Sequence, residues 1–228
     1  MQQAMQIQTH KITTNRIKLV GTVKEIVESF ESMNIKYNKM ILSVTRLSGT
    51  VDEIPVVYKA SGAWMAPVGA KVEVEGTVRT RNVEDNGKNK LEISVYGFIS
   101  IPEKPEGEEE VKDVNEVELE GFICKQPVLR ETPFKKQISD ILIAVNTSYS
   151  RSHYIPLVAF YSEARKASKM QVGDKIVVKG RFQSRTYTKK IPETESEERT
   201  AYEVVLSDLN KVEDEVKPTE TTSEGENK

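Results

Sequence analysis

Val68-Gly-Ala-Lys-Val-Glu-Val-Glu-Gly76 recurs later in this 228-residue chain as Val172-Gly-Asp-Lys-Ile-Val-Val-Lys-Gly180. In both copies a glycine-containing turn precedes an alternation of apolar and polar residues. That alternation is typical of a β-strand with one buried face. A stretch that occurs twice in this form predicts two related domains.

Four more pairs of segments follow the same order in the two halves. Together they predict five strands in each half, as in a small barrel. A short helix is expected between the third and fourth strands, at Glu163 to Met170 and, more weakly, around Ala60 to Ala66. The pairs are Asn15–Gly21 with Asn115–Gly121, Met40–Val44 with Ile141–Val145, Ile54–Val57 with Ile155–Val158, and Leu91–Val95 with Tyr202–Leu206.

This element order is that of the OB-fold. The sequence therefore predicts an all-β chain of two tandem OB-fold five-stranded Greek-key barrels, each with a short helix between strands 3 and 4. Residues 102–110 form a polar stretch rich in Pro, Gly and Glu, which predicts a linker. The expected divisions are a flexible N-terminus at 1–14, barrels at 15–101 and 115–210, an acidic linker at 102–114 and a disordered acidic tail at 211–228.

The composition excludes several classes of protein. No apolar run is long enough to span a membrane, and the single cysteine, Cys124, cannot form an internal disulfide. A reducing compartment, the cytoplasm, is the expected location. His10 and His153 lie far apart in the repeat, and no nucleotide-binding or CxxC motif occurs. We therefore expect no enzymatic activity, no catalytic residues, no metal site and no cofactor.

Charge is unevenly distributed along a chain whose net charge is only −2. Residues 115–192 carry 14 Lys and Arg against 7 Asp and Glu. The acidic excess lies in the linker, a late loop and the tail. A basic second half favours an anionic partner, although an ordinary mixed-charge surface stays an alternative.

Strand alternation indicates which second-half side chains face outward. Tyr154 and Phe160 are expected on the outer face of the third strand. Unpaired bases stack on such rings, and phosphates attract fixed positive charge, so these residue types together favour single-stranded nucleic acid. Burial of the rings in a barrel cap or a subunit interface is the alternative. The fourth strand is expected to present Lys175, Lys179, Arg181, Arg185 and Tyr187.

The first half presents a different outer surface. Its fourth strand carries Glu73 and Glu75 outward, and its third strand carries no aromatic residue there. Carboxylates repel phosphate, so we expect weaker binding, with Arg79 and Arg81 as secondary contacts. Dimerisation or partner docking is the other role expected of this barrel.

Four segments of the second half occur in a characteristic order: Asn115-Glu-Val-Glu-Leu-Glu-Gly121, Pro127-Val-Leu-Arg-Glu-Thr-Pro133, Tyr154-Ile-Pro-Leu-Val-Ala-Phe160 and Val172-Gly-Asp-Lys-Ile-Val-Val-Lys-Gly-Arg-Phe-Gln-Ser-Arg-Thr-Tyr187. With these segments the second half resembles the bacterial single-stranded-DNA-binding protein family. This resemblance implies base stacking at Tyr149, Tyr154, Phe160 and Tyr187, of which Tyr149 is added by the resemblance alone. The acidic tip with a terminal aromatic, common in the family, is missing from the end of this sequence.

The leading hypothesis is sequence-tolerant binding of single-stranded DNA in replication, repair or recombination. The resemblance implies a homo-oligomer, and two barrels per chain suggest a dimer presenting four OB folds. Replication proteins are further candidate partners, and RNA binding is left open. The alternative is a primosome-like or scaffold module in which DNA contact is weak and protein contact dominates.

Overall fold

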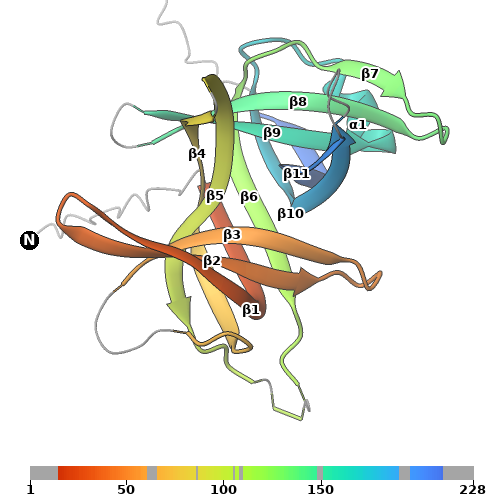
Figure 1. Ribbon diagram of the computed structural model, residues 1–228. Helices are drawn as coiled ribbons and strands as arrows, with labels where there is room; N and C mark the ends of the chain where they lie inside the picture. Colours follow the sequence, from red (N-terminus) through yellow and green to blue (C-terminus); the bar gives the residue numbers. More distant parts are fainter. Residues whose placement is uncertain are drawn as a thin grey trace, which may run out of the picture.

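The computed structural model describes residues 15–60, 66–85, 87–104, 106–107, 110–147, 151–189 and 196–212. Within these ranges the chain forms eleven strands and one short helix (Figure 1). In chain order they are β1 (Asn15–Ser32), β2 (Ile35–Thr45), β3 (Val51–Lys59), β4 (Lys71–Asp85), β5 (Lys88–Ser100), β6 (Val114–Ile123), β7 (Val128–Glu131), β8 (Gln137–Asn146), β9 (Ser152–Phe160), α1 (Tyr161–Ala167), β10 (Lys175–Lys189) and β11 (Glu197–Lys211).

The predicted all-β class with OB-type barrels is confirmed. The strands run in the order β2-β3-β5-β4-β1-β6-β10-β11-β9-β8-β7, and the extra pairings β1–β2 and β6–β8 close a barrel at each end. The helix α1 lies between β9 and β10, as predicted. The sequence predicts its first-half counterpart around Ala60 to Ala66, and residues 61–65 of that segment lie outside the described residues. No helix in the described ranges is long and apolar enough to cross a membrane.

Alternation along each strand builds the core. In β10, Ile176, Val178 and Phe182 are buried, while Lys179 between them is exposed. Leu19 in β1 and Leu119 in β6 are completely buried at equivalent places in the repeat. The period of two therefore predicts the inward face correctly, because successive side chains of a strand point to opposite faces.

Two asparagines anchor the repeat in the same way. The Asn15 side chain donates to the Val78 carbonyl (2.7 Å) and accepts from its amide (2.8 Å). Asn115 makes the same pair of bonds with Phe182, at 2.7 and 2.8 Å. Each side chain satisfies both polar groups of a fourth-strand residue, which explains why both copies of the repeat begin with Asn.

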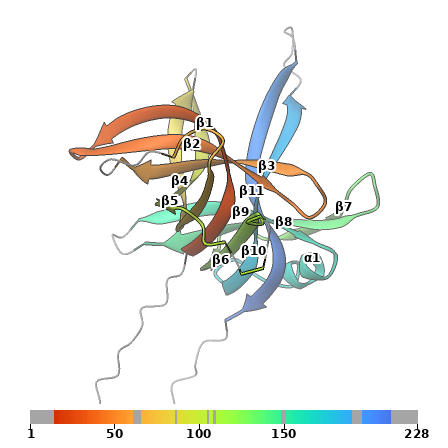
Figure 2. The same cartoon turned by 90° about the horizontal axis from the view of Figure 1, so that it is seen from below.

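The barrels are joined edge to edge into one sheet. Strands β1 and β6 pair antiparallel, with Ile17 opposite Val117 (Figures 1 and 2). Asp113, which precedes β6, accepts from the Thr45 amide at 2.6 Å and pairs with Lys71 of the first barrel. The end of the acidic linker therefore packs on the first barrel.

Each barrel also sends its long fourth strand across the third strand of the other. The Ser184 amide of β10 donates to Asp52 Oδ1 of β3 at 2.9 Å. The Thr80 amide of β4 likewise donates to His153 Nδ1 of β9 at 3.1 Å. Pro55, on the outer face of β3, is buried as a result of the position of this strand between the barrels. The outer surfaces of the two barrels therefore meet and must be considered together.

Candidate nucleic-acid interface

The outer face of β8 and β9 is an apolar strip with a ring at each end. Tyr154 is 48% exposed, and Phe160 at the other end of β9 is half-buried. Small and apolar side chains fill most of the space between the rings, so flat bases could lie along the strip. The exception is Asp140, an exposed carboxylate that lies 2.6 Å from Arg130 Nη2. The cross-strand pairs on this face are Ala144 with Tyr154, Leu142 with Pro156, Asp140 with Val158 and Ile138 with Phe160.

Tyr187 lies near the end of the β10–β11 arm with a cation beside it. Its ring is 38% exposed, and the Arg185 guanidinium lies 5.6 Å from the ring centroid. Arg199 is directly opposite Tyr187 on β11. This end of the arm therefore combines an accessible ring with positive charge.

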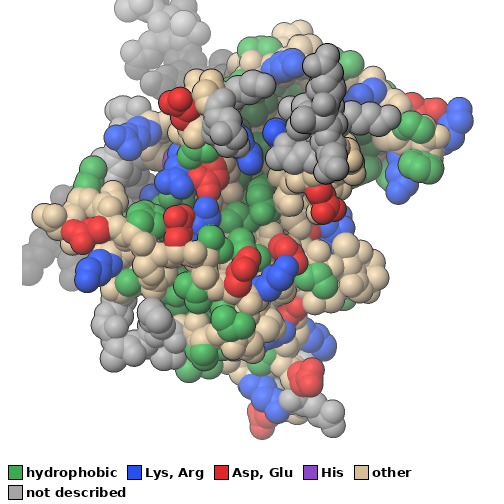
Figure 3. Space-filling view, viewed as in Figure 1, with side chains coloured by type: hydrophobic (Ala, Val, Ile, Leu, Met, Phe, Trp, Pro, Cys, Tyr) green, Lys and Arg blue, Asp and Glu red, His purple; other side chains and the backbone are tan. Residues whose placement is uncertain are grey.

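The basic row predicted on β10 divides into two parts. Lys175 and Lys179 lie beside β6, where Lys175 pairs with Glu120 and Lys179 is opposite Glu118. Arg185 on the arm is 3.9 Å from Glu203. Carboxylates therefore accompany much of this row and compete with phosphate for it. Figure 3 shows the same mixture of basic and acidic side chains over one face of the molecule.

Arg181 has the most restricted environment of the row. Burial, reinforced by the nearby charge of Arg46, lowers the pKa of its guanidinium, and the charge of Asp52 acts in the opposite direction. Its Nε is buried and has no hydrogen-bond partner within the described part of the chain. Arg181 Nη2 lies 3.3 Å from Gln183 Oε1.

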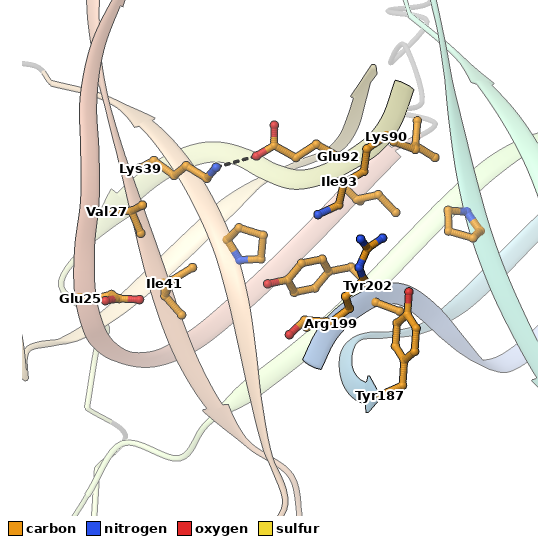
Figure 4. Close-up of a pocket in the computed structure, with 15 residues that line it drawn as sticks. Glu25, Val27, Lys39, Ile41, Lys90, Glu92, Ile93, Tyr187, Arg199 and Tyr202 are labelled. Carbon is orange, nitrogen blue, oxygen red and sulfur yellow. Dashed lines mark hydrogen bonds and ion pairs between the residues drawn. The ribbon is translucent and has the colours of Figure 1, made fainter. Parts of the chain in front are cut away.

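A groove of about 550 Å³ lies between the barrels (Figure 4). Tyr187 and Tyr202 line it from the second barrel, and Ile41 and Val27 line it from the first. Pro55 and Pro156, which occupy the same place in the two copies of the repeat, also line it. The groove covers the outer face of β2 and β3, which corresponds to the ring-bearing face of β8 and β9 in the other barrel.

Charged groups line part of the groove. Glu92 Oε1 lies 2.5 Å from Lys39 Nζ, and Glu92 Oε2 lies 2.5 Å from Arg81 Nε. Burial opposes ionisation of Glu92, yet hydrogen bonds from these two cations hold the pKa of its carboxyl below the ordinary value. Arg81, a predicted secondary contact, is thus held by a carboxylate. Arg79 lies over the Tyr96 ring, 4.9 Å from its centroid.

The predicted residues are only partly brought together. Of the ten, Tyr187 lines the groove, and Lys179 lines a second, shallow cavity beside β1 and β6. Tyr149 lies outside the described residues. Sequence reasoning missed Tyr202, whose burial raises the pKa of its hydroxyl. Its alignment with Leu91 in the repeat places both on fifth-strand arms, and both line the groove.

Comparison with known proteins finds similarity to single-stranded-DNA-binding proteins. The family model described as "Single-strand binding protein family" matches residues 114–212. The single-stranded DNA-binding protein of Thermus aquaticus is 28% identical over 135 residues, covering 53% of this chain and 51% of that protein. The Thermus thermophilus protein of the same name is 27% identical over 134 residues, with the same coverage. The chain thus spans about half the length of these relatives.

Solved structures agree over more of the chain. The wild-type single-stranded DNA binding protein from Thermus aquaticus matches with a TM-score of 0.65 and 25% identity, over 87% of this chain and 93% of that one. A deletion mutant of the same protein matches with a TM-score of 0.68 and 24% identity, over 90% and 98%. The similarity in fold therefore includes both barrels, although the family model matches the second.

Proposed function

Because residues 114–212 match the single-strand binding protein family, we propose that the chain belongs to this family and binds single-stranded DNA with little sequence preference. The observation that carries the proposal is the position of Tyr187. Its exposed ring lines the groove between the barrels, with Arg185 against it and Arg199 opposite on β11. Stacking on an aromatic ring is worth about 1–3 kcal/mol per base and tolerates every base.

The proposed path of the strand connects the two barrels. It runs along β9 from Phe160 to Tyr154 and continues through the groove past Tyr187. Pro156 supports this course because it belongs both to the ring-bearing strip and to the groove lining. We assign Tyr149 to the same path. The proposed phosphate contacts are Lys175, Lys179, Arg181 and Arg185, with Arg79 and Arg81 as secondary contacts.

A role in DNA replication, repair or recombination follows as part of the same proposal, since each process exposes single strands. We also propose a homo-oligomer in which two chains present four barrels. The same proposal treats residues 102–114 as a linker between the two barrels. The rings that stack on bases are assigned to the second barrel.

A second candidate function is a primosome-like or scaffold module with weak DNA contact. It is favoured by the carboxylates that accompany the basic row, such as Glu120 at Lys175 and Glu203 near Arg185. A protein partner would be bound by such a mixed surface, whereas phosphate has to compete with it.

One titration separates the two candidates. Fluorescently labelled oligo-dT, oligo-dA and a duplex of equal length are titrated with the full chain at two salt concentrations. We expect tight binding of both single strands, weak binding of the duplex, and a log–log salt slope of about −0.7 for each phosphate contact. Equal affinity for duplex and single strands, or binding that is insensitive to salt, would contradict the proposal.

A further inference from the structure

Tyr161 has a backbone conformation that tyrosine rarely adopts. Its φ is 48°, in the left-handed region, where the Cβ of any residue other than glycine approaches the following carbonyl oxygen too closely. The other described non-glycine residues with positive φ are Met33, Asn34 and Lys135, all in the turns of hairpins. Tyr161 instead stands where β9 passes into α1. A bulky side chain kept in a strained position is a reason to look for function.

The strained backbone determines where the ring lies. In a continuing strand, residue 161 would point to the face opposite Phe160, toward the core. The left-handed residue turns the chain, so the Tyr161 ring instead lies beside the Phe160 ring. The centroids are 6.4 Å apart with an interplanar angle of 43°, and Tyr161 is 53% exposed. The conformation thus places a second accessible ring at the end of the ring-bearing strip.

A cation lies one helical turn further along. Arg165 follows Tyr161 by four residues on α1, which places both on the same face of the helix. Arg165 is exposed, and its Nη1 donates to the amide oxygen of Gln137 at 2.6 Å. Since this partner is neutral, the hydrogen bond orients the guanidinium without cancelling its charge.

We propose that Tyr161 is a further base-stacking residue, and that Arg165 contacts the adjacent phosphate. Together they extend the path of the single strand beyond Phe160 onto α1. This inference rests on the proposed function, since it adds one nucleotide to that same site. It also gives a reason for the ring at a position where glycine would fit the backbone without strain.

The test is Tyr161→Gly in the full chain, titrated with an oligo-dT length series. Glycine adopts the left-handed backbone, so we expect Tm to be retained or to rise by up to about 4 °C. Affinity for long oligo-dT should fall about 5- to 150-fold, the loss of one stacked base. The deficit should vanish for oligonucleotides too short to reach α1, whereas a general folding defect would weaken binding at every length.

Three further variants test whether the loss of affinity comes from the loss of the Tyr161 ring. Tyr161→Phe keeps a ring and should bind like the wild type. Tyr161→Asn also removes the ring and tolerates the left-handed backbone, so it repeats the test should the glycine variant fold poorly. Met33→Gly is the matched control, because Met33 has φ 50° and is 89% exposed but carries no ring. Its affinity should be unchanged.

Arg165→Gln tests the phosphate contact separately. Its salt slope should become shallower by about 0.7, whereas Tyr161→Gly should leave the slope unchanged. If the wild type binds oligo-dT and Tyr161→Gly binds equally well at every length, the inference is overturned and the proposed function stands. If the wild type itself does not bind oligo-dT, the proposed function fails.

Discussion

The two barrels share one scaffold but differ in the residues that face outward. Asn15 and Asn115 make the same pair of hydrogen bonds, and Leu19 and Leu119 are both completely buried. At the places of Tyr154 and Tyr187, however, the first barrel has Glu53 and Val83. The two copies of the repeat carry similar residues at buried positions, because these residues determine the fold. At outward-facing positions the two copies differ.

The groove shows that this difference is not a simple division of labour. It covers the outer face of β2 and β3 in the first barrel, yet Tyr187 and Tyr202 belong to the second. The arm of one barrel thus supplies rings to a surface of the other. The barrel that carries a ring is therefore not always the barrel whose surface that ring borders.

The largest effect is expected from removing two rings of the second barrel. Tyr154→Ala combined with Tyr187→Ala should weaken oligo-dT binding by about 2–6 kcal/mol, because two stacking platforms are lost. Fluorescence titration at fixed salt measures the change. The control is the equivalent pair in the first barrel, Glu53→Ala with Val83→Ala, which should bind as the wild type does. Equal losses in the two pairs would remove the proposed asymmetry.

The next effect concerns the two junctions between the barrels. Asp52 is fully buried, holds Arg46 through bonds of 2.5 and 2.7 Å, and accepts from the Ser184 amide. Asp52→Ala leaves both partners unsatisfied, so unfolding should become easier by about 3 kcal/mol. At the equivalent place, His153→Ala loses an acceptor for one amide and should cost about 1 kcal/mol. Denaturant unfolding compares them, and the reverse order would contradict this account.

A smaller difference is expected between the two anchoring asparagines. Asn15→Ala and Asn115→Ala each remove two hydrogen bonds to a fourth strand, at about 1 kcal/mol per bond. Asn15 is 6% exposed, whereas Asn115 is half-buried and water can partly replace its bonds. Asn15→Ala should therefore lower the free energy of unfolding by about 2 kcal/mol, and Asn115→Ala by somewhat less. Urea unfolding with a constant m-value is the measurement.

The smallest effect is a pH dependence at one junction. Burial, aided by the charges of Arg79 and Arg151, lowers the pKa of His153. The Thr80 carbonyl, 3.1 Å from Nδ1, acts in the opposite direction, because a protonated Nδ1 can donate to it. The unfolded chain therefore binds the proton more readily. Stability should be complete above pH of about 6.5 and decline below it, by at most about 1.4 kcal/mol per pH unit for one proton.

His153→Asn isolates this contribution, because other groups titrate in the same chain. The difference in unfolding free energy between wild type and variant should depend on pH between about 5 and 7. A difference that stays constant over that range would show that the junction does not sense the protonation of His153.

Much of the fold could be predicted from the sequence, and less of the candidate site. The repeated Gly-strand-Gly stretches gave the strand order, and alternation gave the buried faces of β10, because both signals are local. The pairing of Glu92 with Arg81 and of Glu120 with Lys175 could not be predicted, since each joins residues from different strands. The positive φ of Tyr161 could not be predicted either, because none of the residues around it in the sequence is specific for that backbone conformation.

The sequence by itself determined that two similar barrels form and which side chains of each strand are apolar. The tertiary structure decided that β1 pairs with β6, that each long arm crosses the other barrel, and that Pro55 and Pro156 share one groove. The physical reason is the distance along the sequence between the residues that interact. Strand periodicity is a property of neighbouring residues, whereas the course of a surface across two barrels depends on contacts between residues 73 to 132 positions apart.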